Sequence, residues 1–195
     1  QKLHQQGIFR IDDLTTDDLE ELQYSQRIMP FLSDKLYLPP LSLEYKNPNN
    51  IEIYLDFEST SSLSDNQPLI FLTGVLVKYG DGKLEYTPYL VKHLNKESES
   101  EMLEKVLLFL DSLGPNTPVF HWSFAEPTML KKAGYELSSN CYWVDLYKHF
   151  VTNQATIPGC YSYGLKDVAK RLHQLKKIQS QWLHGLDGNS AMVMA

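Results

Sequence analysis

Hydrophobic and polar residues alternate over residues 51–59, IEIYLDFES. The alternation separates two sets of side chains, the apolar Ile51, Ile53, Leu55 and Phe57 and the polar Glu52, Tyr54, Asp56 and Glu58. Because successive side chains of a strand point to opposite sides, this pattern predicts a strand with one buried face and one polar face. Three carboxylates then lie on the polar face, and two of them, Asp56 and Glu58, are only two residues apart.

Four further segments have the pattern of strands. The largely apolar segment Leu69–Tyr79 predicts a second strand, and a tight turn at Gly80–Gly82 leads into a third predicted strand, Lys83–Val91. The short run PVFHW at 118–122 predicts another strand, and YWVDLY at 142–147 predicts either a short strand or the entry into a helix.

Three segments have the spacing of helices. The first carries an apolar stripe formed by Leu103, Val106, Leu107, Leu110 and Leu113. Ser98 and Glu101 are spaced as a capping box at its start, and Gly114 and Pro115 end it. A second helix is predicted at about 124–133, and a third over Gly164–Leu175. The third is predicted to turn four side chains inward, namely Leu165, Val168, Ala169 and Leu172.

The order of these elements, β-β-β-α-β-α-β-α, predicts an α/β fold with a mixed sheet flanked by helices. Residues 1–29 form a predicted small helical segment with the outline of a helix-hairpin-helix, or alternatively a helical linker. Residues 30–49 contain four prolines and predict an extended linker. Residues 50–195 form the predicted α/β domain.

Composition narrows the class of protein. The chain has 195 residues, of which 43% are hydrophobic, and this is enough for one sizeable domain. Its apolar runs are shorter than the roughly 18 residues of a membrane span, so no membrane partner is expected. The two cysteines lack metal-ligand spacing and fit a reducing compartment, which predicts an intracellular location, cytoplasmic or nuclear.

The net charge of −6 argues against a pure nucleic-acid-binding module, which needs Lys and Arg for phosphate contacts. It does not argue against a nuclease, because bound cations neutralise the carboxylates that a metal site collects. Asp56 and Glu58 repel each other unless a cation lies between them, so they are metal-ligand candidates. The alternative is that both lie on a solvated face.

Two further acids are candidates. Glu126 lies at the start of the second helix and has the position of a metal ligand, but Ser123 and Glu126 are also spaced as a capping box. Asp145 lies in an apolar run, where it is either a structural hydrogen-bonding residue or a site residue at a strand tip. Four nearby aromatic residues are candidates for base stacking or for the core, namely Tyr54, Phe57, Trp122 and Phe124.

The last predicted helix is the most basic stretch of the chain. Its cationic residues are Lys166, Lys170, Arg171, Lys176 and Lys177. Such a stretch is commonly a solvated helix face, and the functional alternative is a face that contacts phosphates.

Five segments, in order along the chain, resemble a known family. They are YLDFES, VFHWSFAEPTML, WVDLY, YSYGLKDVAKRL and LDGNSAM. Together they resemble the ribonuclease H-like nuclease domain that accompanies RecB-family nuclease modules, a branch of the DEDD 3′–5′ exonuclease superfamily. The resemblance covers roughly residues 50–195.

The resemblance implies roles for individual residues. Asp56 and Glu58 match the first exonuclease motif and Glu126 matches the second, so all three are expected to bind two Mg²⁺ or Mn²⁺ ions. Asp145 matches a further acid of the family and is expected at the catalytic centre. Tyr163, Lys166 and Lys170 lie in the segment expected on the substrate side.

The resemblance also implies the activity, hydrolysis of phosphodiester bonds of DNA or RNA from a single-stranded 3′ end. The family's last metal-binding Asp follows the Asp187-Gly188 segment, and the chain stops at Ala195 before it, so the domain is expected to be truncated at its C-terminus. Two alternatives remain open. One is a catalytically inactive docking or nucleic-acid-binding module in a polypeptide that carries further domains, such as a RecB-like nuclease or a helicase. The other is a purely structural interaction domain, which predicts no metal-dependent change in melting temperature.

Overall fold

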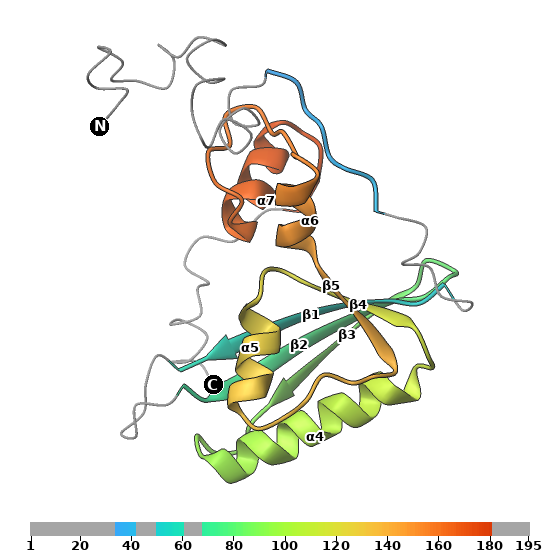
Figure 1. Ribbon diagram of the computed structural model, residues 1–195, viewed down its shortest axis with the longest axis vertical. Helices are drawn as coiled ribbons and strands as arrows, with labels where there is room; N and C mark the ends of the chain where they lie inside the picture. Colours follow the sequence, from blue (N-terminus) through green and yellow to red (C-terminus); the bar gives the residue numbers. More distant parts are fainter. Residues whose placement is uncertain (1–33, 42–49, 61–67, 181–195) are drawn as a thin grey trace. The chain divides into compact units, whose positions relative to one another are not determined.

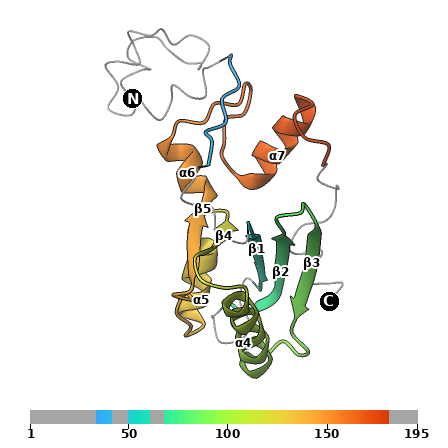
Figure 2. The ribbon, with the colours of Figure 1, turned by 90° about the vertical axis from the view of Figure 1, so that its right-hand side faces the viewer.

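Five strands form one mixed sheet in the computed structural model, which describes residues 34–41, 50–60 and 68–180. The strands are β1 (Glu52–Ser59), β2 (Ile70–Lys78), β3 (Leu84–Leu90), β4 (Thr117–His121) and β5 (Cys141–Asp145). Their order in the sheet is β3-β2-β1-β4-β5 (Figures 1 and 2). The pairs β1–β2 and β2–β3 are antiparallel, whereas β1–β4 and β4–β5 are parallel. The predicted α/β fold with a mixed sheet is therefore confirmed.

Four helices accompany the sheet in the described part of the chain. They are α4 (Lys96–Ser112), α5 (Ala125–Lys132), α6 (Leu146–Thr152) and α7 (Leu165–Gln174). The described residues divide into two compact units, one of residues 34–40 and 147–180 and one that contains the sheet, α4 and α5. Within these residues, none of the helices combines the length and apolar character needed to cross a membrane. The predicted helical segment 1–29 and Asp187 lie outside the described residues.

The core of the sheet unit lies between the sheet and helices α4 and α5. Strand β1 contributes Ile53, Leu55 and Phe57, as its alternation predicts, and α4 contributes the buried part of its apolar stripe. Leu130 of α5 packs into the same cluster, so both helices cover one face of the sheet. The opposite face of β1 carries Asp56, which is exposed, and Glu58, which is half-buried.

Helix α4 begins earlier than its predicted capping box. Asn95 is the N-cap residue, and its side-chain oxygen accepts a hydrogen bond from the Ser98 amide at 2.9 Å. The prediction of Ser98 as the cap is therefore wrong. Asn and Ser are about equally good caps, and Asn95 leaves room for one more helical turn before Ser98.

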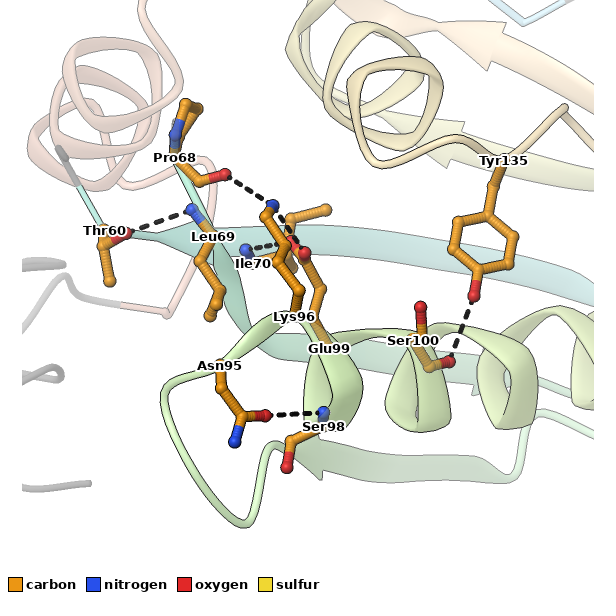
Figure 3. A network of polar contacts seen from close by, with 10 residues as sticks. All are labelled: Thr60, Pro68, Leu69, Ile70, Asn95, Lys96, Ser98, Glu99, Ser100 and Tyr135. Atoms are coloured by element: carbon orange, nitrogen blue, oxygen red, sulfur yellow. Dashed lines mark hydrogen bonds and ion pairs between the residues drawn. The ribbon is translucent and has the colours of Figure 1, made fainter. Parts of the chain in front are cut away.

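Glu99, in the first turn of α4, is buried, and Figure 3 shows its polar contacts. Its Oε1 accepts the backbone N–H of Ile70 at 2.7 Å, and its Oε2 accepts from Lys96 Nζ at 2.7 Å. Lys96 Nζ also donates to the carbonyl oxygen of Pro68 at 3.2 Å. Glu99 therefore connects the start of β2 to the first turn of α4 through a buried carboxylate.

The smaller unit has its own buried residues. Val168 and Leu172 of α7 are buried as predicted, but Leu165 is 39% exposed, so its predicted inward position is wrong. Leu165 is the first residue of α7, where no preceding helical turn covers a side chain. An isolated bridge pairs Tyr37 with Thr156 and ties residues 34–40 to the segment before α7.

Candidate functional site

Strand β1 presents the first two predicted ligands on the face of the sheet opposite the core. In the antiparallel pairing with β2, Asp56 lies opposite Gly74, and Glu58 lies opposite Leu72. Gly74 leaves space that the ring of Tyr86 fills, because a Cβ atom at Gly74 would lie 3.0 Å from the Tyr86 hydroxyl. Asp56 thus lies where the central strand is regularly paired with β2, next to the ring of Tyr86.

Tyr54 shares this face but is not suited to proton transfer. Its hydroxyl donates to Glu52 Oε2 at 2.8 Å, and its ring stacks on Phe120 with centroids 5.2 Å apart. Burial, and then the neighbouring Glu52, raises the pKa of Tyr54 well above its ordinary value. The phenol therefore stays protonated at neutral pH, and the role of Tyr54 beside Asp56 and Glu58 is structural.

The turn between β4 and α5 holds the next group of site residues. Ser123 adopts a positive φ of 84°, which costs a non-glycine residue on the order of 1 kcal/mol. Its amide donates to Asp145 Oδ1 at 3.1 Å, and its carbonyl oxygen lies 2.6 Å from His121 Nδ1. Because a carbonyl oxygen only accepts, Nδ1 of His121 carries the proton and donates it. These two hydrogen bonds offset the strain of the turn and fix its shape.

Glu126, in the first turn of α5, is buried beneath this turn. Its Oε2 lies 3.5 Å from His121 Nδ1 and has no hydrogen-bond partner among the described residues. The N-cap residue of α5 is Phe124, without a side-chain cap, and Ser123 Oγ accepts instead from Ala125 N at 3.3 Å. The capping-box alternative for Glu126 is therefore wrong. A buried carboxylate oxygen without a donor is costly, so this oxygen is well suited to a cation.

The structure thus places His121 Nδ1 and Glu126 Oε2 3.5 Å apart and connects Asp145 to the same turn through the Ser123 amide. Asp56 and Glu58 lie on the adjacent strand β1, on the face of the sheet opposite the core that α5 covers. His121 and Asp145 are register partners at the carboxyl ends of the parallel strands β4 and β5. Among the described residues, no three His, Cys, Asp or Glu side chains gather as a set that could hold a metal ion. The donor chemistry nevertheless fits Mg²⁺ or Mn²⁺, which prefer carboxylate oxygens, because Asp56 and Glu58 share a face and Glu126 has an orphan oxygen.

We expect Glu126→Gln to separate a metal-binding role from a purely structural one. Glutamine keeps the shape of the side chain and removes a buried charge, so the melting temperature without metal should stay the same or rise. The gain in melting temperature on adding Mn²⁺ should fall by more than half. A ligand that occupies its site at about 100 times its Kd stabilises the folded state by about 2.7 kcal/mol, which is readily measured by differential scanning fluorimetry.

Glu136→Gln is the matched control, because Glu136 is an exposed acid outside the site. If Glu126 serves only as the partner of His121, Glu126→Gln instead lowers the melting temperature in EDTA and leaves the Mn²⁺ gain unchanged.

The predicted substrate-binding residues lie in the smaller unit and differ in accessibility. Tyr163 is only 8% exposed, its hydroxyl donates to the carbonyl oxygen of Ala155, and its ring packs edge-on against Phe150. These contacts are structural, and its contact with a substrate stays a prediction. Lys166 and Lys170 are both exposed and lie one turn apart on α7, so they project from the same side of the helix.

Sequence reasoning did not single out His121 as a site residue. It is 4% exposed, and its ring lies 5.9 Å from that of Trp143. The sequence feature that could have identified His121 is its position at the end of an apolar strand, five residues before Glu126. Of the four candidate stacking residues, Phe57 belongs to the core, whereas Phe124 is 74% exposed, two residues before Glu126.

Residues 53–193 match the family model described as the RNase_H superfamily. No curated protein matches the chain. The matched range includes β1 with its two acids, the β4–α5 turn, Asp145 and the whole of α7.

Proposed function

The chain belongs to the RNase H superfamily, and from that membership we propose that it is a metal-dependent nuclease acting as a 3′–5′ exonuclease of the DEDD type on DNA or RNA. The superfamily typically consists of hydrolytic nucleases that use divalent metals. The observation that carries the proposal is the acidic pair Asp56 and Glu58 on the central strand β1. The neighbouring parallel strand β4 leads into the turn before Glu126, whose buried Oε2 has no hydrogen-bond partner among the described residues.

Asp56, Glu58 and Glu126 are the residues that would hold two Mg²⁺ or Mn²⁺ ions. In such sites the ions lower the pKa of a water molecule and stabilise the leaving oxygen of the phosphodiester. Asp145 is a positioning residue in this proposal, because its carboxylate accepts the Ser123 amide and so fixes the turn from which Glu126 projects. His121 holds its proton at Nδ1 and fixes the same turn through the Ser123 carbonyl.

Phe124 gives the proposed site a surface for a nucleobase. Its ring is exposed at the start of α5, two residues before Glu126, on a turn that two hydrogen bonds hold in place. A base stacked on such a ring contributes about 1–3 kcal/mol without regard to sequence. This placement supports a substrate with an unpaired end, since the bases of a duplex are not free to stack on a side chain.

A second candidate function is a catalytically inactive nucleic-acid-binding or docking module of a larger helicase or nuclease. The observation that favours it is that the described carboxylates do not assemble into a set of three metal ligands. This candidate predicts binding to nucleic acid that does not depend on metal, and no cleavage.

The proposal is tested with single-stranded DNA and RNA oligonucleotides labelled at the 5′ end and incubated with Mn²⁺ or with EDTA. We expect a ladder of products shortened from the 3′ end, only with Mn²⁺, and a block of that ladder by phosphorothioate linkages at the 3′ end. Internal fragments that ignore this block would indicate an endonuclease instead. Metal-independent binding without cleavage would favour the docking module.

A further inference from the structure

A pocket with a volume of about 390 Å³ lies in the smaller unit, between the loop 159–162 and helix α7. Its lining includes six residues that bear on its chemistry, namely Gly159, Tyr161, Ser162, Asp167, Lys170 and Arg171. The volume lies in the range of sites for small ligands, about 300–1,000 Å³. Of the residues assigned to the proposed nuclease site above, only Lys170 lines it.

Arg171 is fixed in place within this pocket. Its Nε donates to the carbonyl oxygen of Pro158, and its Nη1 donates to Gln174 Oε1 at 3.0 Å. The guanidinium group lies across Gly159, where an added Cβ atom would be 2.6 Å from Nη2, and Gly159 has a φ of +71°. Glycine is favoured here by the left-handed backbone conformation, and a Cβ atom at this position would displace the guanidinium group. The two hydrogen bonds of Arg171 use two of the five N–H donors of the guanidinium group. Arg171 is therefore held in position with three N–H donors left for a ligand.

Lys170 and Tyr161 complete the pocket. Lys170 is exposed, and among the described residues it makes no hydrogen bond or ion pair, so its ammonium group is available to an anion. The ring of Tyr161 is 63% exposed at the same pocket. Asp167 is the acid of the lining, and two cations against one carboxylate leave a net charge of +1 in a chain whose net charge is −6.

Two cations beside an exposed aromatic ring match the two parts of a nucleotide. Lys and Arg recognise phosphate through charge-assisted hydrogen bonds, and an aromatic ring accepts any base by stacking. We propose that this pocket binds one nucleotide unit of a nucleic-acid strand, with the phosphate at Lys170 and Arg171 and the base against Tyr161. The inference rests on the proposed nuclease function, because the strand is that enzyme's substrate. It assigns the aromatic contact to Tyr161, whose ring is exposed, where the sequence alone pointed to Tyr163, whose ring is buried.

The test is binding of a fluorescently labelled single-stranded oligonucleotide to the full chain in EDTA, followed by anisotropy at several salt concentrations. Lys170→Glu should weaken binding about tenfold or more, and Lys170→Gln, which removes only the charge, should lower the salt dependence by about one phosphate contact. Tyr161→Ala should weaken binding about tenfold and leave the salt dependence unchanged. Lys132→Glu, at the end of α5, makes the same charge change outside the pocket and should have little effect.

The two proposals fail in different ways. If the chain cleaves the labelled strand but the Lys170 and Tyr161 variants bind as tightly as Lys132→Glu, the pocket proposal is overturned and the nuclease proposal stands. If the chain does not cleave but binding depends on Lys170 and Tyr161, the pocket proposal stands without the nuclease. No binding of the oligonucleotide by the unaltered chain would overturn the pocket proposal outright. Melting temperatures equal to that of the unaltered chain show that the variants are folded.

Discussion

Replacement of Asp56 by asparagine should abolish metal-dependent cleavage, with a loss of about a thousandfold or more, while the protein remains folded. Asn has the same shape but carries no charge, so it binds a divalent cation far more weakly. Loss of one pre-positioned group that stabilises transition-state charge costs on the order of 10²–10³ in rate, and loss of a metal ligand should reach at least the upper end of that range. Initial rates on a labelled oligonucleotide with Mn²⁺ measure the effect.

The fold should tolerate this change because Asp56 is exposed and the backbone of β1 keeps its pairing with β2. We expect a melting temperature in EDTA close to that of the unaltered chain. Glu136→Gln, which removes an exposed negative charge outside the site, should cleave at the unaltered rate. Equal cleavage by Asp56→Asn and Glu136→Gln would show that the acidic pair on β1 is not the catalytic centre.

Glu99→Ala should destabilise the protein, lowering its free energy of unfolding by about 2–3 kcal/mol. The side chain of Glu99 is 4% exposed, and its removal leaves the buried Ile70 amide without an acceptor, a loss worth about 1–3 kcal/mol. Loss of the Lys96 partner adds little, because the Lys96 side chain is 52% exposed and returns to water. Urea denaturation measures the change.

Two variants of the same helical turn sharpen this test. Glu97→Ala removes an exposed acid of the first turn of α4 and should cost about 0.5 kcal/mol, from the helix dipole alone. Glu99→Gln keeps an oxygen that can accept the Ile70 amide and should fall between the two alanine variants. A loss for Glu99→Ala no greater than that for Glu97→Ala would contradict the buried role of Glu99.

Most of the sheet was predictable from the sequence because its strands carry local patterns. The alternation of β1 identifies both its buried and its acidic face, and the two segments on either side of the Gly80–Gly82 turn give the bounds of β2 and β3 to within one residue. The sequence left residues 142–147 open between a strand and a helix, and the structure has β5 followed directly by α6. The start of α4 was not predictable in this way. Asn95 and Ser98 are both good caps, and which of them serves depends on whether Glu99 finds the Ile70 amide, 29 residues earlier in the chain.

The candidate site was likewise predictable only where it depends on local sequence. That Asp56 and Glu58 share a face follows from the period of a strand, which is a local property. The environment of Glu126 depends on the left-handed conformation of Ser123, which is held by Asp145, 22 residues further along the chain. Tyr161 and Tyr163 flank the same serine, and the buried ring is distinguished from the exposed one by the contacts of Tyr163 with Phe150 and with the carbonyl oxygen of Ala155.

Whether Asp56 is a ligand of a catalytic metal ion is answered by a crystal soaked in Mn²⁺. Data collected at a wavelength where manganese scatters anomalously locate the ion without reference to any assay. We expect an anomalous peak beside the carboxylate of Asp56, with Glu58 among its neighbours. Bound manganese elsewhere in the crystal, with no anomalous density beside Asp56, would rule out Asp56 as a metal ligand.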